Sequence, residues 1–200
     1  MTASANTPIT LEKDGATSIP RTSGLTAVLK WHGRDGDNSG DLDFYCFYVT
    51  TKEKTGKIYY KNRGKEDTDP YIRLLGDSQN PGEETIIIER PEEIKYLLFS
   101  AYSAAENGIG SFYSYNAYVI ISNNEDKKVI VPLLEKNNQS YWVAIALLDF
   151  TVNDSNVQIK QIEKYSAKNC ERSPILQADG TVEMDAGDIE FKGFDLKIKK

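Results

Sequence analysis

Short alternating runs of apolar and polar residues recur along the chain and constrain its fold more than any other feature. The run from Leu25 to Trp31 has an apolar side chain at every second position, so these side chains share one face of a strand. Residues 41–50 carry apolar side chains on both faces beyond Asp43, which indicates a central strand covered on both sides. About ten strands at this spacing, with almost no helical periodicity, are typical of a sandwich or barrel. We expect an all-β fold, a β-sandwich of mostly antiparallel strands with little helix.

Polar turns and loops rich in Gly, Asn and Asp separate the runs. The expected strands cover residues 9–13, 25–31, 41–50, 57–60, 85–89, 96–102, 117–122, 129–133, 141–148 and 157–165, and residues 70–75 form a short apolar segment. Residues 1–8 have little to bury and are expected to form a tail. Residues 166–187 show no clear period, whereas residues 189–198 alternate with a slip at Lys192-Gly193, as a β-bulge produces. The predicted organisation is a tail (1–8), one domain (9–165) and a C-terminal extension (166–200) that ends in a strand packed on that domain.

Composition excludes several classes of protein. A chain of 200 residues buries roughly 70% of its unfolded surface, so it needs neither disulfide nor metal merely to fold. The net charge of −6, without a basic run of five residues, argues against nucleic-acid binding. The two cysteines fit a reducing compartment, and Cys46 is most simply a small buried hydrophobe. With no signal peptide and no long apolar stretch, we expect a cytoplasmic protein that does not insert into a membrane.

The first cluster of candidate metal ligands covers residues 35–43 and has acids at alternate positions. Calcium takes six to eight oxygen ligands, which such a loop can supply. The opening matches an EF-hand, but the twelfth position is Cys46 in place of a bidentate glutamate, so this is not an EF-hand. Asp41 and Asp43 lie two apart in an extended segment and point to the same face. Taken alone, the pair is most simply explained by two acids that face water.

The second cluster covers residues 76–84 and carries acids, amides and glycines around a sharp turn. Taken alone, it is most simply an ordinary solvated loop. Each cluster, however, precedes a strongly apolar strand, so both can lie at the same end of a sandwich and form one site.

The order and spacing of several motifs resemble the tellurite-resistance (Ter) stress-protein family, with its TerD/TerA-like domain. Gly40-Asp41-Leu42-Asp43 is similar to the Asp-Leu-Asp motif of that family, and Trp31 holds the place of the tryptophan ahead of it. The segment Gly76-Asp77-Ser78, followed by Gly82-Glu83-Glu84, resembles the family's second acidic segment. Residues 70–78 look closest to the TerA-type branch, and the resemblance covers roughly residues 9–150.

This resemblance implies a β-sandwich that binds Ca²⁺ through acidic loops and acts with other Ter-type proteins, including at a membrane-associated complex. Carried over residue by residue, the best ligand candidates are Asp41, Asp43, Asp77, Glu83 and Glu84, with Asp37 and Asn80 in second rank. The second loop is shorter and poorer in Asp than the family's, and it contains Pro81, so one ion at most is expected. The family's C-terminal tryptophan strand is also missing.

Enzyme signatures are weak, and we expect neither catalytic residues nor an organic cofactor. The single histidine, His32, lacks a partner motif, and the chain has no zinc spacing, P-loop or Gly-x-Ser-x-Gly elbow. The adjacent acids do not form the opposed pair that a glycosidase needs. The two cysteines lie far apart in sequence, without the paired-thiol motif that reduction of tellurite would need.

The sequence therefore predicts a Ca²⁺-binding stress protein that acts through protein partners. The alternative is a Ca²⁺-stabilised module that binds a small ligand or carbohydrate, with residues 112–115 as an aromatic platform, although such residues more often fill a core. A purely structural partner protein without metal is a third hypothesis.

Overall fold

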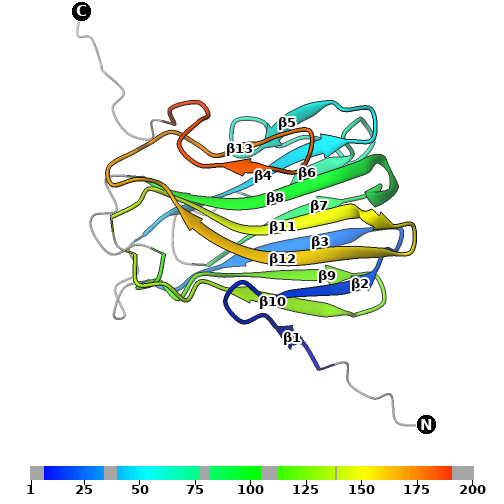
Figure 1. Cartoon of the computed structure of the whole chain (residues 1–200), viewed down its shortest axis with the longest axis horizontal. Coiled ribbons are helices and arrows are strands. Elements are labelled where there is room, and N and C mark those ends of the chain that lie inside the picture. The colour runs from blue at the N-terminus through cyan, green and yellow to red at the C-terminus, as the bar shows by residue number, and fades with distance from the viewer. Residues whose placement is uncertain (1–6, 34–39, 77–81, 105–111, 138, 191–200) are drawn as a thin grey trace, which may run out of the picture.

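A computed structural model of the chain describes residues 7–33, 40–76, 82–104, 112–137 and 139–190. Two six-stranded sheets pack face to face (Figure 1), which confirms the predicted all-β sandwich. The first sheet has the order β1 (Ile9–Thr10), β10 (Lys128–Pro132), β9 (Tyr118–Asn123), β3 (Leu25–Lys30), β7 (Glu83–Ile88), β6 (Ile72–Leu74). The second has the order β2 (Ala16–Pro20), β12 (Asn156–Tyr165), β11 (Trp142–Asn153), β8 (Ile94–Ser103), β4 (Leu42–Thr50), β5 (Thr55–Ile58). Neighbouring strands are antiparallel, except that β1 runs parallel to β10.

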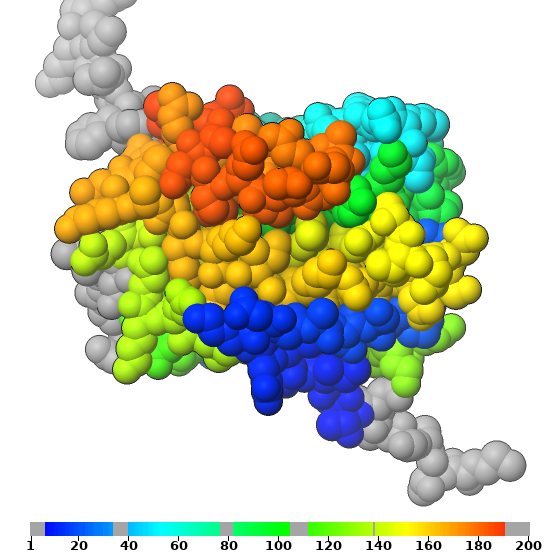
Figure 2. Space-filling view, in the orientation of Figure 1, coloured from blue at the N-terminus to red at the C-terminus, as the bar shows by residue number. Residues whose placement is uncertain are grey.

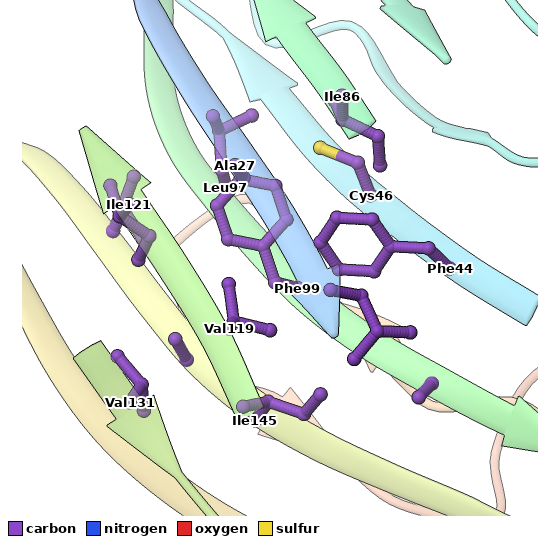
Figure 3. Close-up of a cluster of buried hydrophobic side chains, with 14 of the residues drawn as sticks. Ala27, Phe44, Cys46, Ile86, Leu97, Phe99, Val119, Ile121, Val131 and Ile145 are labelled. Carbon is purple, nitrogen blue, oxygen red and sulfur yellow. The ribbon is translucent and has the colours of Figure 1, made fainter. Parts of the chain in front are cut away.

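The core between the sheets is built by the predicted alternation. On β3, Leu25, Ala27 and Leu29 are buried, whereas the side chains between them are partly exposed. Figure 3 shows Ala27 facing side chains of the second sheet, among them Phe44 and Cys46 of β4. Cys46 is fully buried in this cluster, as its apolar surroundings in the sequence predicted.

Strand β4 is buried at every position because both of its faces are covered, as its sequence predicted. It lies next to the edge strand β5 and is not central in its sheet. Its outer face, with Tyr45 and Phe47, is covered by residues that follow β12, among them Leu176 of the short hairpin β13 (Ile175–Leu176) and β14 (Val182–Glu183). Figure 2 shows this C-terminal segment, in orange and red, spread over the face between β11 and β5.

The remaining differences are local. Strand β2, the hairpin β13–β14 and the three-residue 3₁₀ helix η2 (Pro91–Glu93) were not predicted, and β1 is shorter than the expected strand. Most of the bulged strand expected at residues 189–198 lies outside the described residues. Among the residues described, no helix is long and apolar enough to cross a membrane.

Candidate metal centre

Trp31 links the ends of the two acidic clusters. It follows β3, is 2% exposed, and its backbone N–H donates to the carbonyl oxygen of Gly82 at 3.1 Å. Its indole Nε1–H donates to the carbonyl oxygen of Gly40 at 3.0 Å. Gly40 immediately precedes the Asp41-Leu42-Asp43 motif, and Gly82 immediately precedes Glu83-Glu84. The two motifs therefore start beside the same tryptophan, at one end of the sandwich.

A third loop packs against the same point. The N–H of His32 donates to the carbonyl oxygen of Tyr115 at 2.7 Å, and the ring of Tyr115 is 1% exposed. Gly40 has a positive φ of 113°, and a Cβ atom there would come within 2.6 Å of that ring. Glycine is thus required both for the backbone conformation and for the close approach of the aromatic side chain.

Glu84 reaches from one sheet to the other. Its side chain points between the sheets and is 2% exposed. The N–H of Phe44 in β4 donates to its Oε2 at 2.8 Å. The backbone pairing of β5 with β4 ends at Cys46. Beyond that point the carboxylate of Glu84, and not a neighbouring strand, accepts the N–H of Phe44 on β4.

Asp43 lies on the opposite face of β4 from the core. Leu42 and Phe44 belong to the cluster between the sheets, whereas Tyr45 belongs to the outer cluster, and alternation puts Asp43 on the side of Tyr45. Burial, together with the carboxylates of Glu190 and Asp43, raises the pKa of Tyr45 well above its usual range. Asp43 is 1% exposed, so the simple explanation that it faces water is wrong. Asp41, just before the strand, is half-buried.

Glu83 points away from Glu84, onto the exposed face of the first sheet. It pairs across the strands with Lys30, whose Nζ lies 2.8 Å from Oε2 of Glu83. This hydrogen bond raises the pKa of Lys30. Two adjacent glutamates therefore have different surroundings: one carboxylate is in a surface ion pair and the other is buried.

The described residues supply part of the predicted ligand set. Asp41, Asp43 and Glu84 lie around the start of β4 and are buried or half-buried, but Asp43 lies on the outer face of the strand and Glu84 points between the sheets, so the structure does not bring these two side chains to one face. Within the described ranges, no group of three Asp, Glu, His or Cys side chains is placed to hold a metal ion. The other predicted ligands, Asp37, Asp77 and Asn80, lie outside the described residues.

A buried carboxylate that the sequence analysis missed anchors a further loop at this end. Glu163 is 6% exposed, and its Oε1 accepts hydrogen bonds from the N–H of Glu135 at 2.7 Å and from the hydroxyl of Tyr165 at 3.1 Å. The signal was present: Gln161 and Glu163 are polar residues on the otherwise apolar face of β12. A polar residue on a buried strand face needs a hydrogen-bond partner, here the backbone of the loop after β10.

This loop also borders a polar pocket of about 510 Å³, lined among others by Lys136, Ser140, Ser166 and Lys168. The predicted aromatic platform has a different environment. Phe112 and Tyr115 are buried, which supports the core interpretation for those two rings, and Tyr113 is half-buried with Lys136 over its ring.

Two solved structures share this fold. A homologue of the telluride resistance protein TerD from Streptomyces coelicolor A3(2) superposes with a TM-score of 0.53 over 74% of this chain and 92% of its own, at 13% identity. A protein of unknown function, SAV2460, superposes with a TM-score of 0.50 over 72% of this chain and 91% of its own, also at 13% identity. No family model and no curated protein matches the sequence. The resemblance found in the sequence is thus confirmed as a TerD-like fold.

Proposed function

We propose that this TerD-like β-sandwich is a Ca²⁺-binding protein of the stress and tellurite-resistance type, which acts through protein partners and is not an enzyme. The observation that carries the proposal is the pair of hydrogen bonds from Trp31 to the carbonyl oxygens of Gly40 and Gly82. They hold two oxygen-rich segments side by side, as a single shared ion requires.

The ligand chemistry supports calcium. Calcium favours carboxylate, amide and carbonyl oxygens, which are the donors that the two segments contain. Asp41, Asp43 and Glu84 are the candidates among the described residues, and Asp37, Asp77 and Asn80 are the candidates outside them. A divalent cation stabilises the ionised form of carboxylates that lie beside it. Glu83 is the weakest candidate, because Lys30 already neutralises it.

The surroundings of the titratable groups favour a binding role over catalysis. Glu84 accepts a backbone hydrogen bond, Glu83 is in an ion pair, and His32 is exposed on the protein surface. Binding of Ca²⁺ would reduce the negative charge of the two acidic loops and hold them in one conformation. A partner protein could then recognise the calcium-bound surface. We expect partners of the Ter type, a membrane-associated complex among them, and a cytoplasmic location.

The alternative is a Ca²⁺-stabilised module for a small ligand or carbohydrate, and the polar pocket beside Ser140 favours it. Retention of the protein on a glycan array would support this alternative. Calcium-dependent recovery of other Ter-type proteins would support the first.

The first experiment is thermal unfolding of the chelator-stripped protein with and without millimolar Ca²⁺, with Mg²⁺ as the comparison. At about 100 times its Kd, calcium adds roughly 2.7 kcal/mol to the free energy of unfolding, or on the order of 5–10 °C in the midpoint. The variant Asp43→Asn/Glu84→Gln should lose this calcium-induced shift.

The matched control Glu12→Gln/Asp154→Asn removes two exposed acids from turns outside the candidate site and should keep the shift. If the wild-type midpoint does not move at any calcium concentration, the calcium proposal is wrong.

A further inference from the structure

Asp43 belongs to a row of three residues that runs across the outer face of the second sheet. It lies directly opposite Tyr102 of β8, and Tyr102 lies directly opposite Trp142 of β11. Residues directly opposite in antiparallel strands share one face, with Cβ atoms about 4.5–5.5 Å apart. Asp43 and Tyr102 are each 1% exposed, and Trp142 is fully buried. The candidate calcium ligand is thus packed in line with two buried aromatic side chains.

The two aromatic side chains hold the C-terminal cap, which consists of residues 171–190. The indole Nε1–H of Trp142 donates to the carbonyl oxygen of Glu171 at 3.1 Å, and the hydroxyl of Tyr102 donates to the carbonyl oxygen of Glu190 at 3.0 Å. The two ends of the cap also bond to each other, since the N–H of Glu190 donates to the carbonyl oxygen of Glu171 at 3.1 Å. Both ends of the cap are therefore fixed on the row that contains the candidate ligand.

The side chain of Glu190 anchors the end of the cap. It is 5% exposed, and its carboxylate oxygens lie 2.7 Å from Nζ of Lys57 and 3.7 Å from Nζ of Lys61, so nearby lysines balance its charge. Burial raises the pKa of the Tyr45 phenol, and the carboxylates of Glu190 and Asp43 raise it further, which brings both acids to the surroundings of one buried side chain. The anchor of the cap thus lies over β4 in the same neighbourhood as Asp43.

We propose that docking of the C-terminal cap and binding of Ca²⁺ at Asp43 are coupled, with Tyr102 and Glu190 as positioning residues. This inference rests on the calcium site proposed above. The docked cap holds the neighbours of Asp43 in place, so an ion meets a carboxylate that is already oriented and does not have to be ordered on binding. The cap also excludes water, which strengthens the attraction between the ion and the carboxylate. Coupling between two binding events is reciprocal, so Ca²⁺ in turn stabilises the docked cap.

The first test compares two acids of the cap that both pair with Lys57. The side chain of Glu190 is 5% exposed, whereas that of Asp188, 3.2 Å from the same Nζ, is 82% exposed. Calorimetric titration of the full-length protein with Ca²⁺ should show binding weakened about five-fold or more in Glu190→Gln. The matched control Asp188→Asn removes the same charge from the cap surface and should stay within about two-fold of the wild type.

Tyr102→Phe is a second variant that keeps the ring and leaves both acids in place. It removes the hydrogen bond to the carbonyl oxygen of Glu190 and should weaken Ca²⁺ binding by about three-fold or more. Thermal unfolding without metal checks that each variant is folded at the temperature of the titration.

Hydrogen exchange of the wild type gives the reciprocal measurement. The N–H groups of Ser173, Gly187 and Glu190 each donate to a carbonyl oxygen of the cap, and saturating Ca²⁺ should slow their exchange by about five-fold or more. The N–H of Asn123, which donates to Lys127 in the turn between β9 and β10, should exchange at the same rate with and without the ion.

The outcomes separate the coupling from the calcium site itself. If the wild type binds Ca²⁺ but Glu190→Gln and Tyr102→Phe bind it with the same affinity, the coupling is wrong and the calcium site stands. Equal losses in Glu190→Gln and Asp188→Asn would mean a general effect of charge and would also overturn the coupling, as would exchange in the cap that does not respond to Ca²⁺. If the wild type binds no Ca²⁺, the calcium proposal fails and the coupling fails with it.

Discussion

The carboxylate of Glu84 in one sheet accepts the N–H of Phe44 in the other, at 2.8 Å and almost without exposure to solvent. This hydrogen bond fixes the start of β4, and with it Asp43, relative to the second acidic segment. The same side chain thus has a structural role and is a candidate metal ligand, and substitutions can separate the two.

Replacing Glu84 with alanine should lower the free energy of unfolding by about 1–3 kcal/mol, because the buried N–H of Phe44 loses its acceptor. Glu84→Gln keeps an acceptor oxygen and should cost about 1 kcal/mol or less. Urea unfolding without metal measures both. Equal destabilisation by the two substitutions would show that the charge, and not the hydrogen bond, is what matters.

Gly40→Ala should destabilise the protein by about 1–3 kcal/mol, because the new Cβ meets the ring of Tyr115 and φ is positive. Gly76→Ala is the matched control at the start of the other acidic segment, where a Cβ has nothing within 4 Å. Thermal unfolding should place Gly76→Ala close to the wild type. A similar loss for both variants would contradict the packing argument.

Two buried tyrosines on the same face of the second sheet should respond in opposite ways to loss of the hydroxyl. The hydroxyl of Tyr45 has no hydrogen-bond partner among the residues that the structure describes, so Tyr45→Phe should raise the free energy of unfolding by about 1 kcal/mol. The hydroxyl of Tyr102 donates to the carbonyl oxygen of Glu190 at 3.0 Å, so Tyr102→Phe should lower it by about 1 kcal/mol. Chemical unfolding of both variants tests the difference, and a loss in Tyr45→Phe would reveal a partner for that hydroxyl.

Stability should fall as the pH rises above about 10. Burial, with the carboxylates of Glu190 and Asp43, raises the pKa of Tyr45, and burial, with Glu163, raises that of Tyr165. In the unfolded chain these phenols ionise near pH 10. Their contribution to stability is therefore complete below about pH 10 and is lost as the pH rises further toward the folded-state pKa.

Urea unfolding at pH 9 and pH 11 measures the effect, and Tyr45→Phe should reduce the difference between the two. An unchanged difference in that variant would mean that other groups cause the alkaline loss.

The two cysteines should differ in reactivity. Burial raises the pKa of Cys46 well above its usual range, and its side chain is fully buried, whereas Cys170 is partly exposed. A thiol reagent should modify one cysteine in the native protein and the second after unfolding. Cys170→Ser should abolish the native-state reaction, and modification of Cys46 in that folded variant would contradict its burial.

The strands that sequence predicts best are those whose side chains match a simple period. Leu25 to Leu29 alternate, and residues 44–49 form a continuous apolar run, so β3 and β4 could be found from the sequence alone. Strand β2 could not, because its small and polar residues carry no period and its place is set by pairing with β12.

The candidate site was predictable in composition and not in geometry. Sequence places Asp41 and Asp43 on one face, but the burial of Asp43 depends on how distant segments pack over β4. In the same way, the sequence does not show that Glu83 forms an ion pair with Lys30, whereas its neighbour Glu84 accepts a hydrogen bond from Phe44 in the other sheet. Long-range pairing determines both contacts.

The two hydrogen bonds from Trp31 have an evolutionary consequence. They engage backbone carbonyls of glycine and no side chain of the acidic segments. Substitutions of the acidic side chains therefore leave these two hydrogen bonds intact. Selection can therefore change the acidic side chains that have no such structural contact, unlike Glu84, so descendants with different ligands can keep the same fold.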